Sequence, residues 1–275
     1  MTPLSSLWKK GLALLRSQVD RAGEGSLSFC CNICGAPCHT PLATLQRETP
    51  SCQGCSSTVR QRSLIYILSR HFFGHSLPLS DFPIQNNLRG VGMSDWEVFA
   101  VPLSKHLGYT NTYYHQAPKL DILDIPDALI GKLDFLITSD VLEHVAPPVS
   151  RAFVNIRRLL KPGGILILTV PWVPEGETTE HFPDLLDYSI ETLPSGSRVL
   201  NNRTAKGLTQ HYSRLVFHGG AGETLEMRVF SKAGLLQELN DAGFINIHIQ
   251  GDDHLPHGIH WSDPWSLPIT AEAPS

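Results

Sequence analysis

The chain reads LDFLITSDVLEHVAPPVSRAFVNIRRLLKPGGILILTVPW over residues 133–172, and this stretch decides the fold. It contains two apolar runs, Phe135–Thr138 and Ile165–Val170, which are too unbroken for half-exposed strands. Runs of this kind are typical of parallel strands that are covered on both faces. Between the runs, apolar residues recur at helical spacing until Pro162-Gly163-Gly164 supplies a stop. The stretch therefore predicts a strand, a helix and a second strand of one parallel sheet.

A polar segment follows the first of these strands. It contains Ser139, Asp140, Glu143 and His144. In an open parallel sheet, ligands bind beyond the carboxyl ends of the strands. We therefore expect this segment to belong to the functional site.

Two motifs of this stretch, DVLEHV at 140–145 and LKPGG at 160–164, carry a family resemblance. Together they resemble the fourth-strand exit and the turn into the fifth strand of class I S-adenosylmethionine-dependent methyltransferases of the type 11 kind. The resemblance follows the family's order of elements over roughly residues 86–250. It implies an α/β fold: a Rossmann-like, doubly wound, mostly parallel sheet of seven strands. It also implies S-adenosylmethionine as the cofactor.

The same resemblance nominates residues that would bind the cofactor. The segment that begins at Leu88 takes the place of the family's first strand and glycine-rich turn, although Ser94 stands where the family has a third glycine. The family ends its second strand with a carboxylate that holds the ribose, whereas this chain offers only Tyr114, His115 or Gln116. The ordinary alternatives are a plain strand-to-helix turn at the glycines and a surface turn at Asp121. The nominated residues are Gly90, Gly92, His115, Asp121, Ser139 and Asp140.

All six cysteines lie between positions 30 and 55. In a reducing compartment, such a cluster favours a metal site over disulfides. Two Cys-x2-Cys pairs separated by seventeen residues can close a tetrahedral zinc site, and a closed site of four thiolates is structural rather than catalytic. Cys38 with His39 is the alternative source of a ligand, and Cys30 has no assigned role. The predicted zinc ligands are Cys31, Cys34, Cys52 and Cys55.

Composition restricts the function classes. The chain has 275 residues, 41% of them hydrophobic and 17% charged, and a net charge of −4. It therefore lacks the overall basic excess of a nucleic-acid binder. No apolar run approaches the roughly 20 residues that cross a bilayer, and GLALL near the start is too short for a signal-peptide core. We expect no integral membrane association and, by default, a cytoplasmic protein.

The domain organisation follows from these motifs. Residues 1–25 are predicted as an amphipathic helix and a linker, the helix lying on a membrane surface or packed on its own domain. Residues 26–76 form a zinc-ribbon-like module with a helix, on which Arg60, Arg62 and Arg70 are expected to be exposed. Residues 77–253 form the methyltransferase domain, with an insertion at about 173–230. Residues 254–275 are a tail whose ending, ITAEAPS, is predicted to be disordered.

Two histidines are candidate catalytic bases. A methyl group on a sulfonium needs mainly an oriented nucleophile, but a sugar or phenol hydroxyl also needs a base, and imidazole suits that role near neutral pH. His144 lies at the strand exit and His181 in the segment after the next strand. The alternative is that both are structural, because the chain has thirteen histidines. Glu143-His144 is also similar to the metal-binding pair of ubiquinone-pathway O-methyltransferases, but two adjacent ligands are insufficient for a site.

Three functions are compatible with these features. The first is a methyltransferase that acts on a small-molecule or carbohydrate acceptor. The second is an RNA methyltransferase whose zinc module and arginines contact phosphates. The third is an inactive scaffold of the same fold, which the irregular glycine turn and the missing ribose carboxylate would explain.

Overall fold

The computed structural model describes residues 25–218 and 224–275. The amphipathic helix predicted for residues 4–19 and the glycines after His218 lie outside these ranges. Within them, no helix is long and apolar enough to cross a membrane.

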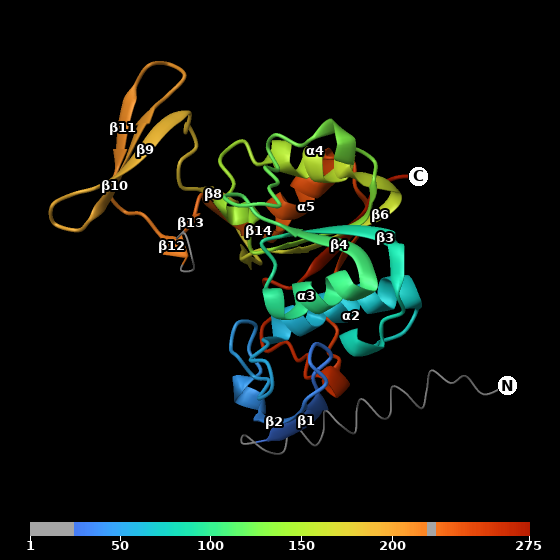
Figure 1. Cartoon of the computed structure of the whole chain (residues 1–275). Coiled ribbons are helices and arrows are strands. Elements are labelled where there is room, and N and C mark those ends of the chain that lie inside the picture. Colours follow the sequence, from blue (N-terminus) through green and yellow to red (C-terminus); the bar gives the residue numbers. More distant parts are fainter. Residues whose placement is uncertain (1–24, 219–223) are drawn as a thin grey trace.

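A six-stranded mixed sheet forms the centre of the molecule (Figure 1). Its strand order is β15-β16-β6-β5-β3-β4. The neighbours from β6 to β4 pair in parallel, whereas β16 runs antiparallel to both β6 and β15. The bounds are β3 Gln85–Met93, β4 Leu107–Thr112, β5 Leu133–Ser139, β6 Leu160–Thr169, β15 Ile245–Ile249 and β16 Ile269–Glu272.

The two central strands, β5 and β6, are buried on both faces. Phe135 and Ile165 are register partners and face one hydrophobic cluster, while the next partners, Leu136 and Leu166, face the other. Alternate residues of both strands therefore need apolar side chains. The predicted strand–helix–strand unit is confirmed.

Four helices cover the two faces of the sheet. In Figure 1, α2 and α3 lie on one side, and α4 and α5 on the other. Thr58 and Gln61 form a capping box at the start of α2, and Ser231 caps α5 as its sequence suggests. The bounds are α2 Val59–Phe73, α3 Glu97–His106, α4 Ser150–Leu159 and α5 Lys232–Asp241; the 3₁₀ helices are η1 Leu42–Thr44, η2 Leu79–Asp81, η3 Asp127–Leu129, η4 Leu142–His144 and η5 Leu255–His257.

The cysteine-containing module is built into the core rather than tethered beside it. Its hairpin pairs β1 Ser26–Cys30 with β2 Pro37–Pro41, and α2 follows the second cysteine pair. Leu64 and Leu68 of α2 belong to the same cluster as Phe135 of β5. The module and the sheet therefore share one hydrophobic core.

The expected exposure of Arg60 and Arg62 is wrong: the side chain of Arg60 is only 15% exposed, and Arg62 lies deeper still. Its side chain is fully buried, and it donates hydrogen bonds to Ser57 O, Ser51 Oγ and Gly258 O at 2.6, 2.9 and 2.8 Å. Buried charge needs such partners, which here come from the module and from the C-terminal segment. Arg62 is consequently unable to contact a phosphate.

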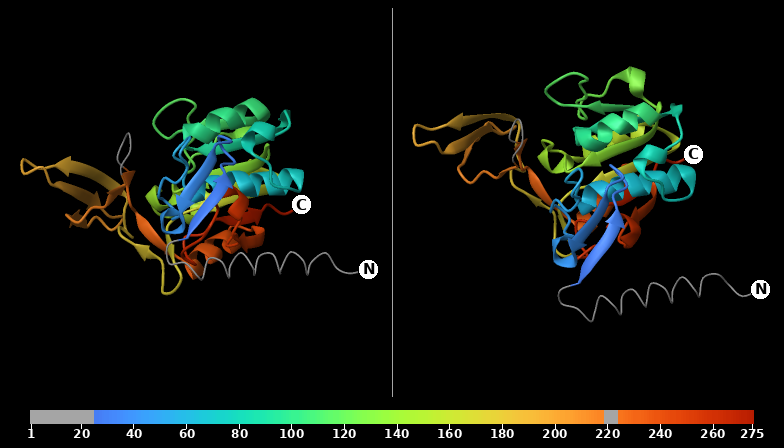
Figure 2. Two further views of the ribbon diagram at one scale, coloured as in Figure 1. Left: turned by 90° about the horizontal axis from the view of Figure 1, so that it is seen from below. Right: turned by 60° about the horizontal axis from the view of Figure 1, so that its bottom comes forward.

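The insertion after β6 forms small sheets of its own. A three-stranded antiparallel sheet, β11-β10-β9, projects from the body of the molecule in both views of Figure 2. Strands β12 and β13 pair antiparallel. The bounds are β7 Trp172–Val173, β8 Thr179–Glu180, β9 Asp187–Thr192, β10 Arg198–Arg203, β11 Thr209–Tyr212, β12 Phe217–His218, β13 Thr224–Leu225 and β14 Arg228–Ser231.

Three further expectations need correction. The described sheet has six strands instead of seven, because the segment that should follow β4 pairs only through one bridge, Tyr113 to Lys119. Proline usually interrupts a helix, but α3 continues through Pro102 to His106. The predicted disordered ending is instead strand β16, which lies between β15 and β6 with its Ile269 and Ala271 buried. Pairing on both sides satisfies the backbone of β16, and this cannot be read from its short sequence.

Candidate functional site

The carboxyl ends of the parallel strands meet at one edge of the sheet. There the amide of Ser94 donates to Thr112 O at 2.7 Å, and that of Asp140 donates to Thr169 O at 2.8 Å. Ser94 and Asp140 have left-handed backbone angles, with φ of 58° and 54°. Non-glycine residues in this region are uncommon and concentrate at functional sites. Strands β3 and β5 thus both end in constrained turns that lead into polar segments.

Gly90 and Gly92 lie inside β3. A Cβ at Gly90 would stand 2.0 Å from the ring of Phe135, and one at Gly92 would stand 1.9 Å from Tyr109 Oη and 2.2 Å from Asp95 Oδ2. Aromatic side chains of the neighbouring strands therefore require glycine at both positions. A role in letting a ligand approach the backbone stays a prediction.

Asp95 is a buried carboxylate beside this turn. Tyr109 donates a hydrogen bond to its Oδ2 at 2.6 Å, while Oδ1 has no hydrogen-bond partner within the described residues. Burial raises the pKa of Asp95 to about 7, against the lowering effects of Tyr109 and of the Arg60 charge. The strand end thus holds an acid that can change its protonation near neutral pH.

Asp140 is bound by two arginines of the cysteine-containing module. Arg47 holds it through two hydrogen bonds, of 3.0 and 2.6 Å, and Arg60 Nε lies 3.2 Å from its Oδ2. Arg60 also donates to Ser139 Oγ, and both guanidiniums contact Glu48. Burial alone would raise the pKa of Asp140, but Arg60 and Arg47 hold it below its usual range. The module therefore completes the site at the end of β5.

Glu143 and His144 lie in the short helix η4, directly after Asp140. Glu143 is fully buried, and neither carboxylate oxygen has a hydrogen-bond partner among the described residues. Burial, followed by the Asp140 charge, raises the pKa of Glu143 to about 8. Ligand atoms of Glu143, His144 and His218 lie within 4.8 Å of one another, so these three side chains have a geometry that could hold a metal ion.

The two candidate bases are joined through Glu226. His144 Nδ1 contacts Leu225 O at 3.0 Å and stacks edge-on with His218. Glu226 in turn lies 2.9 Å from His218 Nε2 and 2.9 Å from His181 Nε2. Burial lowers the pKa of His144, which favours the neutral imidazole. Donation from Nδ1 would leave Nε2, which lies 3.8 Å from Glu143 Oε1, as the nitrogen that accepts a proton.

Two other nominated residues have local contacts. His115 is exposed and packs edge-on against the ring of Tyr114. Asp121 is half-buried, and its Oδ1 accepts the amide of Leu123 at 2.9 Å, which closes a tight turn. The turn explains why an aspartate stands at this position. Cofactor binding by either residue stays a prediction.

The cysteines form a compact cluster. Sγ of Cys31 lies 3.8 Å from that of Cys55, and Sγ of Cys34 lies 3.6 Å from that of Cys52. Zinc–sulfur bonds of about 2.3 Å in a tetrahedron imply sulfur–sulfur distances of roughly 3.8 Å. The four predicted ligands therefore fit a zinc ion. Cys38 contacts only one of them, Cys52, at 3.5 Å among the sulfur contacts described.

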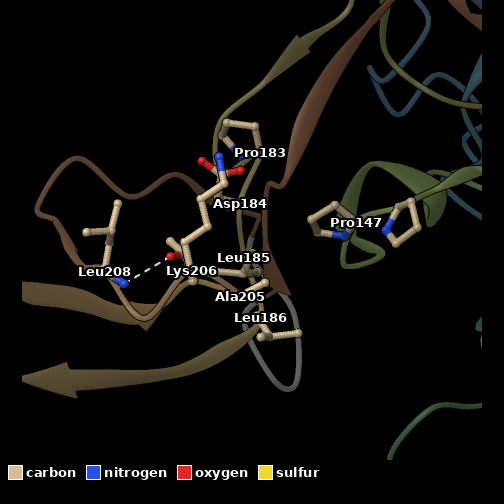
Figure 3. Close-up of a pocket in the computed structure, with 10 residues that line it drawn as sticks. Pro147, Pro183, Asp184, Leu185, Leu186, Ala205, Lys206 and Leu208 are labelled. Carbon is tan, nitrogen blue, oxygen red and sulfur yellow. Dashed lines mark hydrogen bonds between the residues drawn. The ribbon is translucent and has the colours of Figure 1, made fainter.

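A cavity of about 330 Å³ lies between the strand-exit loop and the insertion (Figure 3). Pro147, three residues after His144, faces it from one side, and Asp184 and Leu185 face it from the other. Its lining is mostly apolar. Concave, largely apolar spaces of this size are typical of small-molecule sites.

Several site residues were not nominated from the sequence. Arg47 and Glu48 come from one turn of the cysteine-containing module, Asp95 from the turn after β3, and His218 and Glu226 from the insertion. Asp95 directly follows the glycine-containing turn and is of a type that favours helix caps, but α3 has no side-chain cap and Asp95 instead accepts a hydrogen bond from Tyr109. The others depend on tertiary contacts alone.

One segment of the chain matches a known protein family. Residues 96–168 match the family model of a methyltransferase domain, which covers the chain from the start of α3 to the end of β6. No curated protein matches the chain.

Several solved structures of methyltransferases are similar to this one, at low sequence identity to this chain. They include the CurJ carbon methyltransferase (12% identity, TM-score 0.43, 78% of this chain and 55% of that one). They also include the 1,6-didemethyltoxoflavin-N1-methyltransferase of Burkholderia thailandensis, bound to S-adenosylhomocysteine (14%, 0.41, 78% and 78%). The sugar N-methyltransferase KedS8 from Streptoalloteichus sp ATCC 53650 is a third (12%, 0.43, 78% and 86%). The chain thus spans about half the length of the CurJ enzyme.

Proposed function

We propose that the chain is an S-adenosylmethionine-dependent methyltransferase. The observation that carries the proposal is the pair of left-handed turns at Ser94 and Asp140, which end β3 and β5 side by side. The second turn, at Asp140, lies within the segment that matches the methyltransferase-domain model. Ligands of open parallel sheets bind at this edge.

The groups at this edge fit the amino-acid end of the cofactor. That end carries a carboxylate and an ammonium group, and the site offers the guanidiniums of Arg47 and Arg60 beside the carboxylate of Asp140. The ribose end is less well matched, because no carboxylate directly follows β4. Gly90, Gly92 and Asp121 are proposed to line the adenosine side. When bound, the cofactor supplies a methyl group on a sulfonium.

The acceptor is proposed to be a small molecule or a carbohydrate. The largely apolar cavity between Pro147 and Asp184 supports this, since its volume of about 330 Å³ suits a small molecule. We assign His144 the role of base for a hydroxyl acceptor and His181 a supporting role through Glu226. The RNA alternative loses Arg62, which is buried.

The four cysteines are proposed to hold one structural zinc ion. Its role would be to fix the two turns that begin at Cys31 and Cys52. Arg47 lies between these two turns in the sequence, so the ion would also fix the position of Arg47. Because all four positions are taken by thiolates, no step of methyl transfer is assigned to the ion.

Titration calorimetry with S-adenosylmethionine and S-adenosylhomocysteine tests the proposal. We expect one site per chain and a stabilisation of about 2.7 kcal/mol at a ligand concentration 100 times the Kd. Asp121→Asn keeps the turn but removes the charge, and should weaken binding by roughly 10-fold, the loss expected for one charged hydrogen bond. Asp124→Asn, at the neighbouring carboxylate, is the matched control. No heat and no thermal shift at millimolar cofactor would refute the function.

A further inference from the structure

Two arginines that belong to the cysteine-containing module converge on the end of β5. Arg47 comes from the turn before the second cysteine pair, and Arg60 from the first turn of α2. Their side chains are only 18% and 15% exposed, so both are held in place by the fold. Arg47 is fixed further by donating to Ser266 O at 2.8 Å.

The two guanidiniums lie between an internal carboxylate and an external one. Asp140, on the inner side, is anchored by Thr169 Oγ1 at 3.1 Å and is 21% exposed. Glu48 contacts both arginines, reaching Arg60 Nε and Nη2 at 2.7 Å each, but its side chain is 50% exposed. An ion pair with a half-exposed carboxylate contributes little net free energy. Glu48 can therefore leave the arginines at small cost, whereas Asp140 cannot.

We infer that Arg47 and Arg60 form a binding subsite for a ligand carboxylate, and that Glu48 occupies it until the ligand displaces it. Paired guanidiniums present the parallel donors that a carboxylate accepts, and Arg is suited to this geometry where Lys is not. The contacts of Glu48 thus mark the position that the ligand's carboxylate takes.

The ligand carboxylate is that of the cofactor's amino-acid end, a step that rests on the proposed function. Arg60 reaches Ser139 at the strand end and lies close enough to Asp95 to influence its ionisation. It therefore faces the ends of both β3 and β5, where the cofactor is placed. The carboxylate is not assigned to the methyl acceptor, because the cavity proposed for the acceptor lies elsewhere, between Pro147 and Asp184. The cysteine-containing module is in this way part of the cofactor site.

Two nucleoside probes test the inference. S-adenosylhomocysteine carries the carboxylate, and methylthioadenosine has the same adenosine and thioether but no amino-acid end. In Arg60→Gln, calorimetry should show that the affinity for S-adenosylhomocysteine falls by about 10- to 100-fold, the range for charged hydrogen bonds. The affinity for methylthioadenosine should change by less than about 2-fold. Arg70→Gln, an exposed position on the same helix, should leave both unchanged.

Glu48→Gln supplies a test of opposite sign. Removal of the competing carboxylate should raise the affinity for S-adenosylhomocysteine by a few-fold, and a misfolded variant would not show such a gain. Equal weakening of both probes by Arg60→Gln would show a structural arginine and overturn the subsite. Unchanged S-adenosylhomocysteine affinity in Arg60→Gln, or weaker binding in Glu48→Gln, would also overturn it. If the unmodified protein binds methylthioadenosine but not S-adenosylhomocysteine, the subsite fails alone; if it binds neither, the proposed function fails with it.

Discussion

Replacing Asp95 by Asn should change how the stability of the protein depends on pH. Burial raises the pKa of the Asp95 carboxyl from 3.8 to about 7 in the folded protein. Between these values the folded state keeps the proton that the unfolded state has released. Stability is therefore greatest below the unfolded pKa and falls as pH rises towards 7. The Asp95→Asn side chain has no charge to bury, so this loss should disappear in the variant.

The magnitude follows from the shift. About three pKa units at 1.36 kcal/mol each give a total loss of roughly 4 kcal/mol above pH 7. Between pH 5 and pH 8, the linkage relation gives a change of about 2–3 kcal/mol, as an order of magnitude. The free energy of unfolding of Asp95→Asn, minus that of the unmodified protein, should rise by this amount over that range.

Urea unfolding, followed by circular dichroism at several pH values, measures this difference. Subtraction cancels the contribution of Glu143, whose raised pKa acts in the same direction. Asp81→Asn, which removes an exposed carboxylate, reports the effect of the charge change alone. If the gap between Asp95→Asn and the unmodified protein stays constant from pH 5 to pH 8, the reasoning about a buried acid at the end of β3 is wrong.

Four further outcomes are expected. Arg62→Met should lower the free energy of unfolding by about 3 kcal/mol or more, since it leaves buried acceptors unpaired. Arg70→Met, the control, should change it by less than about 0.5 kcal/mol. Equal effects of the two substitutions in urea titrations would contradict the buried network. Gly92→Ala should destabilise by roughly 2 kcal/mol or more because its Cβ meets Tyr109 Oη, and an unchanged thermal midpoint would show that the strands can separate freely. Cys34→Ser should lose the zinc that metal analysis finds at one ion per chain, while Cys30→Ser keeps it; zinc retained by Cys34→Ser would point to Cys38 as a ligand. A double-mutant cycle of Arg47→Gln and Asp140→Asn should give a coupling of about 1–3 kcal/mol, against less than about 1 kcal/mol for the more exposed pair Lys161 and Asp134, and additive effects at both pairs would refute a structural link between module and sheet.

Local patterns were sufficient to predict the centre of the fold. The apolar runs of β5 and β6 indicate strands buried on both faces, and their alternating partners confirm it. Serine is favoured at helix starts, and Ser231 begins α5, where its side chain accepts from the amide of Gly234. These features depend on neighbours within a few residues, which is why the sequence alone reveals them.

Long-range pairing limited the remaining predictions. Strand β16 has only four residues, and its partners in β6 lie about a hundred positions earlier in the chain. Arg62 looks like Arg60 and Arg70 in the sequence, and one of the acceptors that permit its burial, the carbonyl of Gly258, is 196 residues away. Asp140 was expected to face a ligand, but its guanidinium partner Arg47 is 93 residues away. Contacts of this separation leave no periodic signal in the sequence.

Hydrogen exchange measured with and without S-adenosylmethionine tests the location of the cofactor most directly. We expect slower exchange of the amides at 92–96 and 139–144 when the cofactor is present. Protection confined to the projecting sheet β9–β11, or saturating binding with no change at the ends of β3 and β5, would contradict a cofactor site at the carboxyl edge of the sheet.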